Sequence, residues 1–233
     1  MTGKWKSARM LGVLCLCLGV VVCWSLQWAF AQGGLSSEER RRAEAEAHRM
    51  TAEDWYDHGK VDEAIEQWRD ALRLDPNFAK VHHDLGLALR DKDRLAEAIV
   101  ELREAVRLDP KNASAQADLG DALQERGDRD GALAAYRAAV ALVPSSASVR
   151  SNLGYLLVQK GDLDGAIAEW REATRLDPNY APLHANLGEA LESKGDTQGA
   201  IAAYEQFLTL APGAPNAAEV RRRLTALKAT HTQ

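Results

Sequence analysis

The sequence predicts an all-α protein made of five helix-turn-helix repeats followed by a C-terminal capping helix. Five prolines recur at intervals of 34 residues, and small residues recur in step with them. Aromatic residues make up only 6% of a chain that is 46% hydrophobic. A β-sandwich needs more aromatic and β-branched residues, so the composition favours closely packed helices. The prolines are Pro76, Pro110, Pro144, Pro178 and Pro212.

Each repeat combines small and large side chains at fixed distances from its proline. Glycine and alanine let two helices approach closely, and a large residue fills the space beside them. Because proline cannot continue a helix, it ends the second helix of each repeat. The glycines are Gly86, Gly120, Gly154 and Gly188; the alanines are Ala64, Ala98, Ala132, Ala166 and Ala200; the large residues are Trp68, Leu102, Tyr136, Trp170 and Tyr204.

The turn inside each repeat has residues suited to helix ends. Four repeats have a glycine there, which adopts the left-handed conformation without strain. Asp93 holds this place in the second repeat, where we expect a less favourable turn. Asp162 and Asp164 lie in such a turn, and we predict helix capping rather than acid–base catalysis for them. The four glycines are Gly59, Gly127, Gly161 and Gly195.

The period, the small residues, the aromatic positions and the prolines together resemble the tetratricopeptide repeat (TPR) family, whose repeat has 34 residues. The resemblance implies a right-handed superhelical solenoid. The first repeat departs from the pattern, with Ala52 in place of glycine and Thr51 in place of leucine. Terminal repeats of a solenoid are expected to be atypical. The predicted repeats are 45–78, 79–112, 113–146, 147–180 and 181–214.

The N-terminal segment, 1–31, has the features of a secretory signal peptide. Lys4, Lys6 and Arg9 precede an apolar run, and the sequence Ala-Phe-Ala at 29–31 matches a signal-peptidase site. We expect cleavage after Ala31, which would make the protein periplasmic or secreted.

An uncleaved membrane anchor is the alternative, because residues 11–31 are long enough to cross a bilayer. A lipid anchor at Cys23 fits less well, since Val22 precedes it where such a site needs a small residue. With a signal peptide or an anchor, the basic flank stays inside and the repeats lie outside the cytoplasm. All three cysteines are in this segment, so residues 32–233 contain no disulfide and no thiol nucleophile.

Two flanking helices complete the predicted stack. Ser36 and Glu39 form a capping box that opens a charged lead-in helix over 32–44, continuous with the first repeat. Beyond the repeats, 215–233 is a capping helix and tail, with the helix over 216–228. Its apolar residues face the stack, and its three arginines are expected to face water. The apolar residues are Ala217, Val220, Leu224 and Leu227; the arginines are Arg221, Arg222 and Arg223.

Composition and motifs exclude several functions. The segment 1–31 holds three of the 29 basic residues and no acid, so the remainder has 26 basic and 34 acidic residues, a net charge of −8. Such an acidic chain is a poor nucleic-acid binder. His82 and His83 are neighbours on a helix and point about 100° apart, which disfavours a metal site. No nucleotide-binding, haem or hydrolase motif occurs. We therefore expect no enzyme, no metal and no cofactor.

The resemblance implies a concave groove lined by the first helices of successive repeats, which binds a segment of another protein. Mapping by repeat position assigns a set that we call the groove residues. Its carboxylates favour a basic or neutral partner segment, although they also suit a face that is merely kept soluble. The groove residues are Arg49, Glu53, His83, Asp84, Leu87, Asp118, Asp121, Asn152, Tyr155, Asn186 and Glu189.

Some members of the family clamp a terminal carboxylate with lysine, arginine and asparagine side chains. Asn152 and Asn186 suit the asparagine place of such a clamp, but Ala117 and Pro182 stand where lysine would be needed. We therefore predict that no carboxylate clamp operates here.

These observations predict an exported or membrane-tethered scaffold that binds a partner protein at the cell envelope. The alternatives are a non-catalytic accessory subunit of an envelope enzyme or assembly complex, and a structural protein that stacks end to end. The polar final helix disfavours end-to-end stacking, because it caps the repeats.

Overall fold

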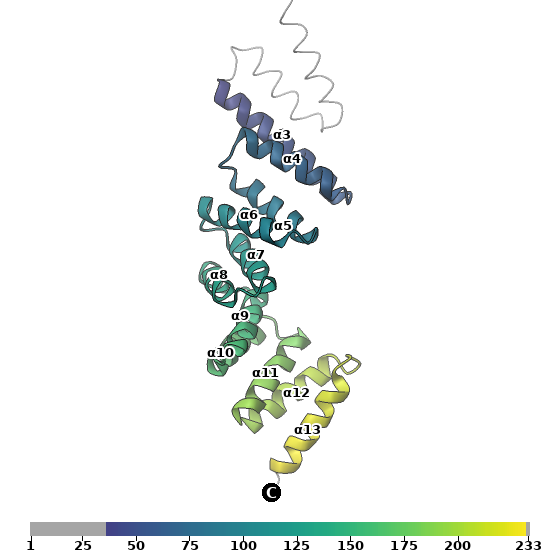
Figure 1. Cartoon of the computed structure of the whole chain (residues 1–233). Helices are drawn as coiled ribbons and strands as arrows, with labels where there is room; N and C mark the ends of the chain where they lie inside the picture. Colours follow the sequence, from purple (N-terminus) through teal and green to yellow (C-terminus); the bar gives the residue numbers. More distant parts are fainter. Residues whose placement is uncertain (1–35, 232–233) are drawn as a thin grey trace, which may run out of the picture. The chain divides into compact units, whose positions relative to one another are not determined.

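The computed structural model describes residues 36–231, so the predicted signal segment and its cysteines lie outside the described residues. This part of the chain is helical throughout and contains no strand, which confirms the predicted all-α class (Figure 1). None of its helices combines the length and apolar composition needed to cross a membrane. The helices are α3 (Ser37–Asp57), α4 (Val61–Leu74), α5 (Ala79–Asp91), α6 (Leu95–Leu108), α7 (Ala113–Glu125), α8 (Arg129–Leu142), α9 (Ala147–Gln159), α10 (Leu163–Leu176), α11 (Ala181–Lys194), α12 (Thr197–Leu210) and α13 (Ala217–His231).

The chain divides into two compact units, whose described residues are 36–94 and 95–231. In unit 1, α3 packs against α4, and α4 packs against α5. α3 and α4 bury the small residues Ala45, Ala52 and Ala64 completely, together with the large Trp68. The long α3 begins at a capping box, in which Ser36 accepts from the Glu39 amide and the Glu39 carboxylate accepts from the Ser36 amide. The helix runs without a break from Ser37 into the first predicted repeat, and residues 32–35 of the predicted lead-in segment lie outside the described residues.

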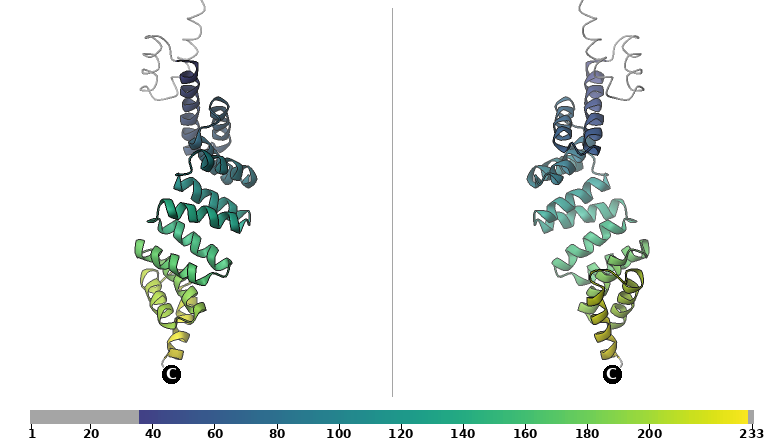
Figure 2. Two further views of the ribbon diagram at one scale, coloured as in Figure 1. Left: turned by 90° about the vertical axis from the view of Figure 1, so that its left-hand side faces the viewer. Right: turned by 90° about the vertical axis from the view of Figure 1, so that its right-hand side faces the viewer.

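In unit 2, each helix from α6 to α13 packs against the next along the chain (Figure 2). One continuous core runs through this unit. Small residues allow the close packing, since a Cβ placed on Gly120 would lie 2.8 Å from the Tyr136 ring. The same relationship links Gly154 with Trp170, at 2.7 Å. In these repeats the small residue of the first helix therefore packs directly against the large residue of the second helix, as predicted.

The helix ends follow the predicted turn chemistry. The helices α4, α6, α8, α10 and α12 each end two residues before one of the five periodic prolines. The glycines in the inner turns have φ between +74° and +85°, and Asp93 has φ of +58°. Asp93 is the sole non-glycine residue in this conformation in the described part of the chain. Asp162 accepts from the Gly165 amide at 2.9 Å and caps α10, as expected.

The C-terminal helix α13 covers the last repeat by packing on α12. Ala217 and Val220 are buried, and Arg221 and Arg222 are exposed, as predicted. The prediction for Arg223 is wrong, because its side chain is only 38% exposed and pairs with carboxylates of α11. Neighbouring residues of a helix point about 100° apart, so three consecutive arginines cannot share one environment.

Candidate functional site

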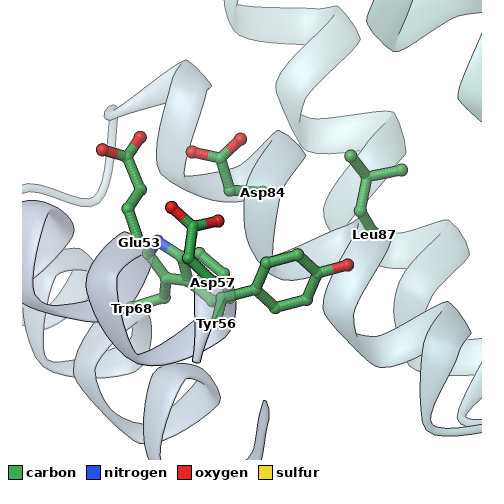
Figure 3. Close-up of a pocket in the computed structure, with 6 residues that line it drawn as sticks. All are labelled: Glu53, Tyr56, Asp57, Trp68, Asp84 and Leu87. Atoms are coloured by element: carbon green, nitrogen blue, oxygen red, sulfur yellow. The ribbon is translucent and has the colours of Figure 1, made fainter. Parts of the chain in front are cut away.

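Unit 1 contains a pocket of about 260 Å³ between α3, α4 and α5. Glu53, Asp84 and Leu87, three of the predicted groove residues, line it. Figure 3 shows the carboxylates of Glu53, Asp57 and Asp84 close together, with the rings of Tyr56 and Trp68 beside them. The pocket therefore combines negative charge with aromatic surface. Its six lining residues are Glu53, Tyr56, Asp57, Trp68, Asp84 and Leu87.

Trp68 has an orientation that follows from the unusual Ala52. In the fourth repeat the equivalent Trp170 lies against Gly154 and donates from Nε1 to the Ser151 carbonyl at 3.1 Å. A Cβ at Gly154 would lie 2.7 Å from that nitrogen, so the methyl group of Ala52 excludes the same ring position in the first repeat. Trp68 instead packs against Tyr56, with ring centroids 5.7 Å apart. Its Nε1 is buried and has no hydrogen-bond partner.

Two of the pocket carboxylates differ in their electrostatic environment. Burial would raise the pKa of Glu53, but hydrogen bonds from Lys80 and Arg49 and the charges of both hold it below its usual value. Burial raises the pKa of Asp84, and the charge of Lys80 only partly opposes this. Asp84 Oδ2 lies 3.8 Å from Lys80 Nζ and has no hydrogen-bond partner. An added cation beside Asp84 would offset the cost of burying its charge.

Two side chains at the pocket are fixed by polar contacts. Tyr56 lines the pocket, and Arg49 pairs with the lining residue Glu53. The Tyr56 hydroxyl donates to Asp91, and this bond, with burial, raises the pKa of Tyr56 to about 12. Arg49 lies between Glu46 and Glu53 and is mostly buried. The predicted groove residue Arg49 is thus committed to ion pairs along its own helix, and His83 lies half-buried on α5.

In unit 2 the structure brings Asp121 and Asn152 together. Asn152 Nδ2 donates to Asp121 Oδ1 at 3.3 Å, and the Tyr136 hydroxyl donates to the same oxygen. Asp118 and Asn186 are half-buried on α7 and α11. Tyr155 is 50% exposed on α9, so it is the largest apolar surface among the groove residues of this unit.

Glu189, the last groove residue, is paired with the chain's own capping helix. Arg223 Nη1 of α13 lies 3.8 Å from Glu189 Oε1 and 3.4 Å from Glu192 Oε2. It also donates to the Tyr204 hydroxyl at 3.4 Å, and that hydroxyl donates to Glu192 at 2.6 Å. Arg223 Nε contacts Glu219 at 3.0 Å. A guanidinium therefore already occupies the groove position of the last repeat.

Sequence reasoning missed Tyr56, Asp57 and Trp68 as pocket residues. Tyr56 and Asp57 follow Glu53 by three and four residues on one helix, and this spacing places them on the same face. Helical periodicity could therefore have found both. Trp68 was predicted only as a core residue, because the residues next to it in the sequence do not determine the orientation of its ring.

Within residues 36–231, no group of three or more histidine, cysteine, aspartate or glutamate side chains is placed to hold a metal ion.

The family comparison matches most of the helical region. A family model described as TPR repeat matches residues 54–92, 86–127, 120–161 and 154–195. A second, described as tetratricopeptide repeat, matches residues 183–218. Together these matches extend over more than half of the chain. The comparison with curated protein sequences gives no match.

Solved structures of similar fold include MamA, which is 26% identical, with a TM-score of 0.66 over 69% of this chain and 94% of MamA. YrrB, described as a TPR protein with an unusual peptide-binding site, is 22% identical, with a TM-score of 0.70 over 76% of this chain and 92% of YrrB. PilF of Pseudomonas aeruginosa is 21% identical, with a TM-score of 0.69 over 82% of this chain and 87% of PilF. At these identities YrrB and PilF show the fold alone.

Proposed function

Because the chain belongs to the tetratricopeptide repeat family, we propose that it is a non-catalytic scaffold of the cell envelope whose groove residues bind a segment of a partner protein. The repeats and the two flanking helices account for all of residues 36–231, which leaves no described segment for a separate catalytic domain. The peptide-binding site of YrrB supports a similar role for this fold here.

The contact between Arg223 and the carboxylates of α11 is the observation that favours a basic partner segment. Glu189 lies at a groove position, and it pairs with a guanidinium within the protein itself. Asp84, Asp118 and Asp121 present carboxylates at groove positions of other repeats. A partner segment with basic side chains meets complementary charge there.

The proposed location rests on the N-terminal sequence. The basic start, the apolar run and the Ala-Phe-Ala site at 29–31 direct the repeats to the outside of the cytoplasmic membrane. The partner is then a protein of the envelope.

Affinity capture from the native envelope fraction tests this function. The tagged full chain is compared with a variant carrying Asp118→Lys and Asp121→Lys, and captured proteins are identified by mass spectrometry. A matched control carries Asp130→Lys and Asp164→Lys, which change the net charge equally at side chains 82% and 78% exposed on the second helices of their repeats.

The groove variant is expected to lose a partner that the control retains. If both variants capture the same proteins as the unaltered chain, the groove residues of unit 2 do not bind the partner. Equal loss in both variants would mean that net charge, and not the groove, decides capture.

A further inference from the structure

We propose that the pocket of the first repeat is an anchor site for an arginine side chain of the partner segment. This inference rests on the proposed function and gives it a defined contact. The last repeat has an arginine of the protein itself at the equivalent position, and the first repeat does not.

The last repeat has an arginine at the position equivalent to this pocket. Because four repeat periods separate the first repeat from the last, Glu189 corresponds to Glu53 and Tyr204 corresponds to Trp68. Arg223 lies between these side chains of the last repeat, where it donates to the Tyr204 hydroxyl at 3.4 Å and pairs with the α11 carboxylates. In the last repeat, therefore, the position equivalent to the pocket is filled by a guanidinium from the capping helix α13 of the protein itself.

The first repeat has no arginine at the position equivalent to Arg223, and its two nearby cations, Arg49 and Lys80, pair with Glu53. Leu87 stands four repeat periods before Arg223, and its uncharged side chain lines the pocket. Asp84 Oδ2 is left without a hydrogen-bond partner and Lys80 Nζ is 3.8 Å away. An added guanidinium offers five N–H donors in a planar arrangement that suits carboxylates.

Trp68 provides the second, independent observation. Its side chain is 2% exposed, it lines the pocket, and its Nε1 has no acceptor. The ring polar atoms of Tyr136, Trp170 and Tyr204, at the same position of other repeats, all have hydrogen-bond partners. An unpaired buried donor is costly, and the indole that carries it forms part of the pocket wall, where a bound arginine side chain contacts the ring.

A titration followed by NMR tests the anchor directly. The full chain, labelled with ¹⁵N and purified in detergent, is titrated with the peptide acetyl-Gly-Gly-Arg-Gly-Gly-amide, and the Trp68 indole N–H resonance is assigned by Trp68→Phe. The matched peptide contains citrulline, which keeps the shape of arginine and removes its charge. We expect a saturable shift of the Trp68 resonance with the arginine peptide, and binding weaker by about tenfold or more with citrulline.

Two variants of one residue separate the anchor from general effects on folding. Leu87→Arg supplies an internal guanidinium at the position of Arg223 and is expected to weaken peptide binding by about tenfold or more. Leu87→Met keeps the size and neutrality of leucine and is expected to change binding by less than about twofold. Circular dichroism is the control for folding, and both variants are expected to remain helical.

Equal binding of the two peptides, or an unshifted Trp68 resonance, would overturn the anchor. If Leu87→Arg also leaves capture of the native partner intact while the Asp118 and Asp121 variant loses it, the anchor is rejected and the proposed function stands. If no partner is captured by any form of the chain, the proposed function fails, and the peptide titration still decides whether the pocket binds arginine.

Discussion

Tyr204 packs so closely on Gly188 that a Cβ placed on the glycine would lie 2.5 Å from Tyr204 Cε1. The contact joins α11 to α12, the two helices of the fifth repeat. Tyr204 is buried and holds a hydrogen bond to Glu192, so it has little freedom to move aside.

Gly188→Ala is therefore expected to destabilise unit 2 despite the better helix propensity of alanine. Overpacking costs about 1–3 kcal/mol, and the better helix propensity of alanine offsets about 1 kcal/mol of this. We therefore expect the free energy of unfolding to fall by up to about 2 kcal/mol. Urea denaturation measures it. Gly213→Ala is the control, since nothing lies within 4 Å of the added methyl group; an equal loss in both variants would contradict the steric explanation.

Asp93→Gly is expected to stabilise the protein. Asp93 has φ of +58°, while the four equivalent turns have glycine at φ of +74° to +85°. A left-handed conformation costs a non-glycine residue roughly 1–2 kcal/mol, and the greater entropy of glycine in the unfolded chain offsets part of this, so we expect a gain of about 0.5–1 kcal/mol. Gly161→Ala makes the reverse change without a steric contact and should lower the melting temperature. A melting temperature that Asp93→Gly leaves unchanged or lowers would contradict the assignment of strain.

Glu169→Gln is expected to destabilise the protein more than Asp130→Asn. Arg150 Nη1 lies 2.6 Å from Glu169 Oε2, and the two side chains are only 14% and 22% exposed. The Asp130–Lys160 pair has an aspartate that is 82% exposed. Removing the charge of Glu169 leaves a largely buried arginine less well paired, so we expect a loss of about 1–2 kcal/mol, against less than about 0.5 kcal/mol at the exposed pair. Equal effects in thermal denaturation would count against the role of burial.

Asp84→Asn is expected to raise stability at neutral pH. Burial raises the pKa of Asp84, so the folded protein binds its proton more tightly than the unfolded chain does. The cost of the ionised carboxylate is therefore absent below pH 3.8, the ordinary aspartate value, and fully present above the raised pKa. We expect the variant to be more stable by about 0.5–1 kcal/mol at pH 7, with a difference that shrinks as the pH falls towards 3.8. A pH-independent difference would show that ionisation of Asp84 is not its cause. If the same variant is more stable but no longer binds the arginine peptide, the Asp84 carboxylate serves binding at a cost in stability.

Processing of the N-terminus is the last prediction. If the export segment is cleaved after Ala31, intact-mass measurement of the protein from the native envelope will find a chain that begins at Gln32. Recovery of an intact chain in the membrane fraction would instead favour the anchor. Phe30 lies between the two small residues of the site, and Ala31→Trp places a large side chain at the cleavage position, which should block processing.

Local patterns allowed most of the helices to be predicted. A proline two residues beyond a helix, or a glycine in an inner turn, acts through the backbone of its own neighbours, so its effect needs no knowledge of distant contacts. Ser36 and Glu39 are three residues apart, and their capping box was predicted for the same reason. The repeat period then placed the small and large residues of each repeat opposite one another.

The groove residues stay a prediction, although three of them lie close together in the structure. Glu53, Asp84 and Leu87 were assigned to the groove by their repeat position, and the structure places them around one pocket. The position of Arg223 was predicted wrongly, because a pattern of three arginines does not show which one contacts α11. The partner, the cellular location and the role of all the groove residues stay predictions.

The sequence by itself determined the class of the fold, the length of the repeat and the ends of the helices, because these follow from backbone preferences and spacing along the chain. Only the tertiary structure decided that Trp68 turns its indole into a pocket while Trp170 bonds to its own repeat. The difference depends on one methyl group, that of Ala52, at a contact between helices. Packing at such contacts allows no overlap, so a change of a single carbon atom redirects a whole side chain.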